Sequence, residues 1–253
     1  MSQNINIVIM AAGHGKRMNA DRPKPLVELG GKPMVQHILD AVQSSGICEN
    51  PIIVVSQDNK AKFMEILGSD HVFAIQAEQL GTGHAVKCAG HLLDAEKPTI
   101  VLNGDHPMIS AEMIQRLSDN HVASGAVITM GVVTVPHFDD WYNAFSGWGR
   151  VVCANDGHIE RIIEAKDATP DQLEIREVNP TYFCLKTDWM IEHLERLDND
   201  NAQEEYYLTD LVRMAVEEGE KIVSSPVTPE EGIGINTPEH REMAERILLV
   251  KNT

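Results

Sequence analysis

Strand-like and helix-like segments alternate along the first half of the chain, and this alternation limits the fold more than any other feature of the sequence. Short apolar runs typical of strands occur at 5–10, 51–55, 72–75 and 99–102. Segments with apolar residues at helical spacing follow them at 33–42, 60–67, 84–93 and 111–121, the last with Ser110 as a candidate N-cap. Such alternation is typical of βαβ units. We therefore predict an α/β fold with a mixed, mostly parallel sheet flanked by helices.

The second half of the chain has a less regular pattern. Strand-like runs occur at 127–135, 150–153 and 159–163, and helical patterns at 188–196, 209–217 and 237–249. A chain of 253 residues can form one large domain or two small ones. Because no linker, repeat or low-complexity tract divides it, we expect a single domain over 1–253, with halves at about 1–122 and 123–253.

The charge balance narrows the choice of partners. The chain has 21 Lys and Arg against 38 Asp and Glu, for a net charge of −17. So acidic a protein repels the phosphate backbone, and we expect no nucleic-acid partner. The N-terminal residues show no signal-peptide or membrane-spanning pattern. The four cysteines are too far apart to form a C-x-x-C motif. We expect a cytoplasmic protein with reduced thiols and no membrane partner.

A glycine-rich loop with clustered cations follows the first strand. It reads Ala11-Ala12-Gly13-His14-Gly15-Lys16-Arg17-Met18 and continues through Arg22 to Lys24. Glycines let backbone N–H groups approach an anion closely. Four of the 21 cationic residues lie within 16–24, although the chain as a whole is acidic. The loop therefore indicates a polyphosphate site, with a solvated basic turn as the alternative.

Two other phosphate-binding loops fit this segment poorly. A dinucleotide-binding turn needs Gly or Ala three residues after its second glycine, where this chain has Met18. Prolines at 23 and 25 also follow, although a helix should open there. A P-loop is excluded because no G-K-[ST] closes the motif.

Taken with several later motifs, the loop resembles that of the sugar-phosphate nucleotidyltransferase family. Within that family, the chain is most similar to the N-acetylglucosamine-1-phosphate uridylyltransferase domain of bacterial bifunctional enzymes that make UDP-N-acetylglucosamine. The matching segments are 11–24, 76–85, 103–105, 149–150, 163–168, Asn179, 201–210 and 234–236. The resemblance implies a Rossmann-like nucleotidyltransferase fold. The segments 76–85 and 201–210 are much narrower signatures than the glycine loop, and they indicate the subfamily.

The resemblance also assigns roles to individual residues. Arg17 and Lys24 would be catalytic and contact the phosphates. Asp105 and Asn236 would hold the cofactor, Mg²⁺. The nucleotide would be bound by Ala11, Ala12, Gly13, Gly15, Gln76, Gln79, Gly81 and Thr82, with Gln76 and Gly81 reading the uracil. The sugar phosphate would contact Gly149, Glu164, Asn179, Tyr207 and Thr209.

The implied reaction joins UTP and a sugar-1-phosphate, which are the expected partners, into a UDP-sugar and pyrophosphate. N-acetylglucosamine-1-phosphate is the expected sugar phosphate. The nucleophile is already anionic at neutral pH, because its second pKa is ~6, so no general base is required. One carboxylate and one amide oxygen suit Mg²⁺. The Gln76 amide matches the N3–H and O4 groups of uracil, and it could flip to suit cytosine, whereas a fixed backbone group of Gly81 could not.

Simpler roles remain open for three of these residues. Asp105 could form a turn, Asn236 could cap the last helix, and Glu164 could form a surface pair with Lys166. For the whole chain, the open alternatives are another sugar phosphate, CTP in place of UTP, and a non-catalytic regulator that binds nucleotide sugars.

The chain departs from the family pattern in three places. Asn179-Pro180-Thr181 replaces the usual Asn-Thr-Gly, which alters the wall of the sugar pocket. The aromatic segment 136–148 could be a lid, a partner surface or a packed loop. The hexapeptide repeats of the family's β-helix acetyltransferase domain are missing, so we expect no β-helix trimer, although a homo-oligomer is possible. We expect either a stand-alone transferase or an excised domain.

Overall fold

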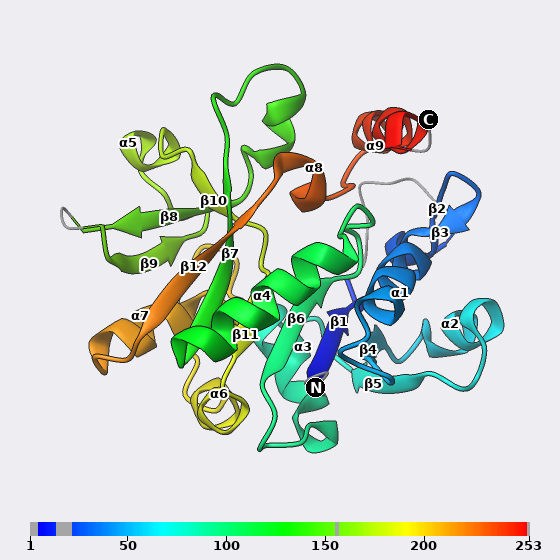
Figure 1. Ribbon diagram of the computed structural model, residues 1–253, viewed down its shortest axis with the longest axis horizontal. Coiled ribbons are helices and arrows are strands. Elements are labelled where there is room, and N and C mark those ends of the chain that lie inside the picture. The colour runs from blue at the N-terminus through cyan, green and yellow to red at the C-terminus, as the bar shows by residue number, and fades with distance from the viewer. Residues whose placement is uncertain (1–4, 14–21, 155–156, 252–253) are drawn as a thin grey trace.

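A computed structural model of the chain describes residues 5–13, 22–154 and 157–251. One mixed sheet runs through the molecule, with helices on both faces (Figure 1). Its strands are β1 (Asn6–Met10), β4 (Ile52–Ser56), β5 (Val72–Gln76), β6 (Thr99–Asn103), β7 (Ile128–Thr134), β8 (Gly149–Cys153), β9 (Ile159–Ile163), β10 (Glu177–Asn179), β11 (Phe183–Leu185) and β12 (Ile222–Val227). A separate hairpin joins β2 (Glu28–Leu29) to β3 (Lys32–Pro33).

The first half of the sheet is parallel. Strands β5, β4, β1 and β6 lie side by side in that order, and each pairs in parallel with its neighbours. Parallel strands all end at the same edge of a sheet, so the segments after β1, β5 and β6 come together there. The expected βαβ organisation of this half is confirmed.

The second half of the sheet is mainly antiparallel. Strand β11 lies between β6 and β7 and is antiparallel to both, while β10, β8 and β9 extend the sheet through antiparallel pairs. The last strand, β12, runs parallel to β7. The expected mixed sheet is therefore confirmed. Its parallel pairs lie within β5-β4-β1-β6 and between β12 and β7, so the sheet as a whole is partly parallel.

Strands β10 and β11 are two pieces of one interrupted strand beside β7. Val178 pairs with Val133, and after the break Phe183 pairs with Met130. The first piece also pairs with β8, and the second with β6. The break at residues 180–182 therefore lies where the sheet divides between its two halves.

Helices cover both faces of the sheet and enclose two apolar cores. One core lies under α1, α2 and α4, and the other under α3, α6 and α7. Alternate residues of a strand enter opposite cores, as Ile7 and Val8 do. The helices are α1 (Met34–Ser45), α2 (Lys60–Leu67), α3 (Thr82–Ala89), α4 (Ala111–Ser124), α5 (Pro170–Leu173), α6 (Thr187–Leu194), α7 (Asp210–Glu217), α8 (Pro229–Gly232) and α9 (Pro238–Lys251), with 3₁₀ turns η2 (Lys24–Leu26), η3 (Gly90–Leu92) and η4 (Asp140–Phe145).

Helix α4 shows how local sequence sets an element. The hydroxyl of Ser110 accepts a hydrogen bond from the backbone N–H of Met113 at 3.0 Å, which satisfies one of the free donors of the first turn. The predicted N-cap is confirmed. Within the described part of the chain, no helix has both the length and the apolar character needed to cross a bilayer.

The aromatic segment 136–148 is a packed loop around η4. Phe145 is buried and makes edge contacts with Trp141 and Trp148. The buried guanidinium of Arg150 holds the segment in place. It donates to the carbonyl of Ser146 at 2.9 Å and lies 4.5 Å from the centre of the Phe138 ring. Of the three possibilities, the structure supports the packed loop.

Candidate functional site

The ends of β1 and β6 touch where the glycine loop begins. The backbone N–H of Gly104 donates to the carbonyl of Met10 at 2.8 Å, and a Cβ on Gly104 would stand 2.8 Å from that oxygen. Only glycine allows so close an approach of the two backbones. As a result, Gly104 lies against Ala11, and Asp105, the next residue, lines the same cavity as the start of the loop.

Lys24, Asp105 and Asn236 converge on one point although they are far apart in sequence. The ammonium of Lys24 donates to Asn236 Oδ1 at 2.7 Å and forms a short ion pair with Asp105 Oδ2. The backbone N–H of Ile235 donates to the carbonyl of Asp105 at 3.0 Å, which brings Asn236 to this place. Two oxygens from different segments therefore face the same positive charge.

These contacts argue against the simpler roles of Asp105 as a turn residue and Asn236 as a helix cap. Helix α9 begins at Pro238 and is capped by Thr237, whose hydroxyl accepts from the N–H of His240 at 3.3 Å. The amide oxygen of Asn236 is directed at Lys24 instead. Its use as the helix cap is therefore wrong, and Asp105 does more than form a turn.

The electrostatics of Asp105 suit a cation. Burial alone would raise the pKa of this carboxyl, but the charge and hydrogen bond of Lys24, together with smaller contributions that include His106, outweigh burial and lower the pKa, so the group is ionised at neutral pH. Its neighbour His106 is stacked on Trp148 with ring centres 5.1 Å apart. Burial lowers the pKa of His106 to about 4, so this ring adds no charge at neutral pH.

The oxygens of Asp105 and Asn236 suit Mg²⁺, but they do not by themselves form a complete metal site. A carboxylate and an amide oxygen are hard ligands, and Mg²⁺ takes its remaining ligands from water and phosphates. In the described residues, no three His, Cys, Asp or Glu side chains form a group that could hold a metal ion. Asp105 and Asn236 could therefore hold Mg²⁺ only together with a phosphate-bearing substrate.

A cavity of about 630 Å³ lies beside this cluster. Of the residues predicted to bind nucleotide or metal, or to act on the phosphates, those that line it are Ala11, Ala12, Gly13, Lys24, Gln76, Gln79, Gly81, Thr82, Asp105 and Asn236. Gly15 and Arg17 lie outside the described residues, so the structure says nothing of their placement. The cavity is also lined by residues that were not predicted as site residues, namely Asn103, Lys166, Gln203 and Glu205.

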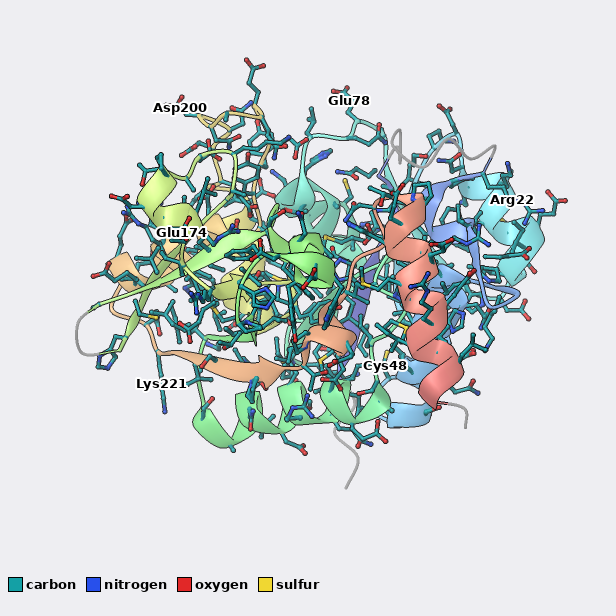
Figure 2. The ribbon with its side chains drawn as sticks, turned by 90° about the horizontal axis from the view of Figure 1, so that it is seen from above. Arg22, Cys48, Glu78, Glu174, Asp200 and Lys221 are labelled. Carbon is teal, nitrogen blue, oxygen red and sulfur yellow. The ribbon has the colours of Figure 1, made fainter. Side chains whose placement is uncertain are left out.

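The turn after β5 is held against the segment 201–208. Gly81 has φ +111°, and a Cβ there would stand 2.5 Å from the carbonyl oxygen of Tyr206. Both the backbone conformation and the close contact therefore require glycine. The N–H of Tyr206 donates to Leu80, and the N–H of Gly83 donates to the carbonyl of Tyr206, each at 2.8 Å. The two narrowest sequence motifs are thus in contact. Figure 2 shows Glu78, from the first motif, and Asp200, which directly precedes the second, on the same side of the molecule.

Gln76 is the last residue of β5 and is almost fully buried, with an exposed fraction of 3%. Its amide nitrogen donates to the carbonyl of Gly81 at 3.0 Å and lies 3.2 Å from Nδ1 of His84. The side chain therefore reaches the cavity wall with one end of its amide already engaged.

Residues predicted to hold the sugar phosphate form a second, adjoining group. The hydroxyl of Thr209 donates to Glu164 Oε1 at 2.8 Å, and Gly149 pairs with Asn179 and lies beside Glu164. Glu164, Tyr207 and Thr209 line a cavity of about 360 Å³, whereas Gly149 and Asn179 are not among the lining residues of either cavity.

The two groups are connected through Gln203. Its amide donates to the hydroxyl of Tyr207 at 2.9 Å, and its oxygen is in close contact with the ammonium of Lys166. Lys166 is thus directed to Gln203, while Glu164 bonds to Thr209. The alternative of a surface pair between Glu164 and Lys166 is therefore wrong.

Asn179 stands at the break between β10 and β11 and has backbone partners at both ends of its amide. Its nitrogen donates to Gly131 at 2.8 Å, and its oxygen accepts from the N–H of Thr181 at 2.9 Å. Thr181 has φ +59°, a left-handed conformation that is strained for a β-branched residue. Asn103, at the end of β6, donates to the carbonyl of Pro180 at 2.8 Å. The departure from the family pattern thus lies at a strained corner.

Comparisons with known proteins give consistent matches. Residues 7–209 match the family described as "MobA-like NTP transferase domain". The chain is 41% identical over 244 residues to the protein named "Bifunctional protein GlmU" of Paraburkholderia phytofirmans, which covers 96% of this chain and 52% of that protein. The proteins of that name from Cupriavidus taiwanensis (43% over 245 residues; 96% and 52%) and Exiguobacterium sibiricum (40% over 231 residues; 90% and 49%) are similar too. The chain spans about half the length of these curated relatives.

Proposed function

The chain belongs to the family of MobA-like NTP transferase domains and is related to GlmU proteins. From this premise, we propose that it transfers the uridylyl group of UTP to a sugar-1-phosphate. The proposed acceptor is N-acetylglucosamine-1-phosphate, and the products are a UDP-sugar and pyrophosphate. The observation that carries this proposal is the convergence of Lys24, Asp105 and Asn236 beside a cavity large enough for a nucleotide.

The chemistry needs placement and positive charge rather than a base. An oxygen of the sugar phosphate forms a bond to the α-phosphorus of UTP while the bond from that phosphorus to the β-phosphate oxygen breaks, and pyrophosphate leaves. The main barrier is repulsion between two anions, so a fixed cation at the reacting phosphates accelerates the step. We propose Lys24 as that cation, supported by its place beside the cavity, and Arg17 as a second.

Asp105 and Asn236 are the proposed magnesium ligands. When bound, Mg²⁺ neutralises phosphate charge and orients the phosphate oxygens. In our proposal, Lys24 exchanges its contacts with Asp105 and Asn236 for contacts with phosphate when the substrates enter. The loop 11–15 binds the nucleotide, and Gly149, Glu164, Asn179, Tyr207 and Thr209 form the sugar-phosphate side.

We further propose that residues 1–253 form one domain of a cytoplasmic enzyme, whose partners are these two substrates. Support comes from the continuous sheet that includes strands of both halves and from the cysteines, which are all free: Cys48, Cys88, Cys153 and Cys184. Free thiols are typical of a reducing compartment.

A pyrophosphate-release assay tests the proposal. UTP, CTP, ATP and GTP are each combined with N-acetylglucosamine-1-phosphate, N-acetylgalactosamine-1-phosphate and glucose-1-phosphate, with and without Mg²⁺. We expect Mg²⁺-dependent turnover and a preference for UTP over CTP of at least ~10-fold in kcat/KM, because one mismatched buried hydrogen bond costs about 1–3 kcal/mol.

Other outcomes of the same assay separate the alternatives. Equal or better use of CTP would overturn the uridylyl assignment, and no release with any pair would favour a nucleotide-sugar-binding regulator. A different sugar-1-phosphate is the second candidate acceptor, and the strained Thr181 at the sugar side favours testing it.

A further inference from the structure

The orientation of the Gln76 amide follows from one backbone carbonyl. The amide end of Gln76 faces the carbonyl oxygen of Gly81 at 3.0 Å. A carbonyl oxygen only accepts hydrogen bonds, so the amide atom that faces it must be the NH₂ group. The usual ambiguity between the nitrogen and oxygen of a glutamine side chain is thereby removed.

The same reasoning fixes the state of His84. Its Nδ1 lies 3.2 Å from the NH₂ group of Gln76, so this ring nitrogen must be an acceptor that carries no proton. The proton of the neutral ring then lies on Nε2, which is 3.7 Å from Sγ of Cys88. Gln76, His84 and Cys88 form a chain of contacts with one defined direction.

The position of His84 is itself well supported. It lies in the first turn of α3, and the N–H of Gly83, the residue before it, is bonded to the carbonyl of Tyr206. The rings of His84 and Tyr206 are 6.5 Å apart. The imidazole therefore belongs to a turn that is tied to a second segment of the chain.

We propose that His84 is a positioning residue for base selection: it accepts a hydrogen bond from the Gln76 NH₂ group and so keeps the Gln76 oxygen directed to the nucleotide cavity. An oxygen in this place accepts from the N3–H of uracil and repels N3 of cytosine, which is also an acceptor. A flipped amide would set its oxygen against the Gly81 carbonyl and His84 Nδ1, two acceptors. The flip that the sequence analysis left open for cytosine is thereby opposed.

This inference rests on the proposed use of UTP, and a set of three variants tests it. His84→Leu introduces an apolar side chain of moderate size and removes the acceptor. His84→Asn places an amide oxygen near the position of Nδ1 and restores an acceptor. Lys87→Ala, on the same helix, removes only a surface ion pair with Glu195 and serves as the control.

The readout is the ratio of kcat/KM for UTP to that for CTP, together with the KM for the sugar phosphate and the melting temperature. We expect His84→Leu to lower the ratio by about 10-fold, chiefly through a higher KM for UTP, with the KM for the sugar phosphate unchanged. His84→Asn should return the ratio to within about 3-fold of the wild-type value. A purely structural role would lower activity with both nucleotides alike and leave the ratio unchanged.

Two results would overturn the proposal: a wild-type ratio in His84→Leu, or equal loss of the ratio in His84→Leu and His84→Asn. Failure of the proposed function is a separate result, namely a wild-type protein that releases no pyrophosphate from UTP. In that event, calorimetric titration of the same variants with UTP and with CTP measures the selectivity of binding. An unchanged selectivity in His84→Leu would again overturn the role of His84.

Discussion

The two sides of the candidate site are built from different kinds of structure. On the proposed nucleotide side, most of the lining residues end or follow the parallel strands β1, β5 and β6, which pack between two apolar cores. On the proposed sugar-phosphate side, Glu164 follows the antiparallel strand β9, Asn179 ends β10 at the break in the strand, and Thr209 directly precedes α7. The first arrangement fixes side chains at one edge of a sheet, whereas the second depends on local bends.

This difference has a consequence for specificity. Buried parallel strands position their ends with little freedom, which suits the phosphates and base, where small displacements are costly. A strand that breaks at a left-handed threonine depends on a few local bonds, so a single substitution can reshape the wall beside it. We therefore expect changes on the nucleotide side to reduce turnover and changes on the sugar side to alter selectivity.

The largest effect is expected from loss of a proposed magnesium ligand on the nucleotide side. Asp105→Asn and Asn236→Ala should each lower kcat by at least ~10³-fold, about 4 kcal/mol, because the charge on the phosphates is then poorly compensated. Pyrophosphate release at saturating substrates measures this loss. Asp188→Asn and Asn120→Ala, remote from the cavity, are the matched controls. Turnover without Mg²⁺, or variants with wild-type rates, would contradict the assignment.

Lys24→Ala should have the next largest effect on the same side. We expect kcat to fall by about 10²–10³-fold, the range for loss of one preorganised charge-stabilising group. Lys32→Ala, whose partner is Asp40 on the surface, should leave kcat unchanged. A near-normal kcat for Lys24→Ala would mean that the basic cluster is only a solvated turn.

On the sugar side, Glu164→Gln should act on one substrate only. It keeps an acceptor for Thr209 but removes the charge, and we expect kcat/KM for the sugar phosphate to fall by about 10–100-fold with the KM for UTP unchanged. Full kinetics with each substrate varied in turn measure this selectivity. An equal effect on both substrates would remove the distinction between the two sides.

The same variant has a predictable pH dependence of stability. Burial raises the pKa of Glu164 above its usual value of 4.5, so the folded state binds more protons than the unfolded state in the window above 4.5. The contribution of this group to the free energy of unfolding is therefore present at low pH and is lost as pH rises. Denaturant unfolding of the wild type and Glu164→Gln should show the variant gaining relative stability between pH 4 and 7. A constant difference would contradict the raised pKa.

The smallest effect is expected at the corner of the broken strand. Thr181→Gly should raise the free energy of unfolding by about 1 kcal/mol, because glycine accepts φ +59° without steric cost. Its effect on turnover with UTP should be slight, whereas relative rates among sugar-1-phosphates should change. Thr169→Gly, at an exposed helix cap, should instead destabilise slightly and serves as the comparison. A destabilised Thr181→Gly protein would show that the threonine makes compensating contacts.

The sequence predicts elements that are set by local signals better than elements that are set by pairing between distant segments. The helix expected at 60–67 is α2, and the Ser110 cap is present, because helical spacing and capping are local signals. Strands β10 and β11 were missed because each has three residues and Pro180 lies between them. Strand β12 was missed because Ser224, Ser225 and Pro226 do not resemble a strand. Proline is acceptable there because the described pairing of β12 is with β7 alone.

The candidate site divides in the same way. The position of Asp105 after an apolar strand and the cations near the glycine loop were visible in the sequence. The nearness of Lys166 and Gln203 to the nucleotide cavity was not, since it depends on how two distant loops fold over the sheet. The orientation of the Gln76 amide also required coordinates, because its NH₂ group faces two acceptors, the carbonyl of Gly81 and Nδ1 of His84.

The hydrogen bond from Asn103 to the carbonyl of Pro180 limits how far the two pockets are separate modules. Asn103 is two residues before Asp105, and Pro180 follows Asn179, so the bond ties the strand that ends at the phosphate site to the corner beside the sugar site. If only the loop around Pro180 were replaced by that of a relative, Asn103 would remain and its hydrogen-bond partner would change. To change the choice of sugar phosphate, an engineered exchange must therefore replace β6, β10 and β11 together.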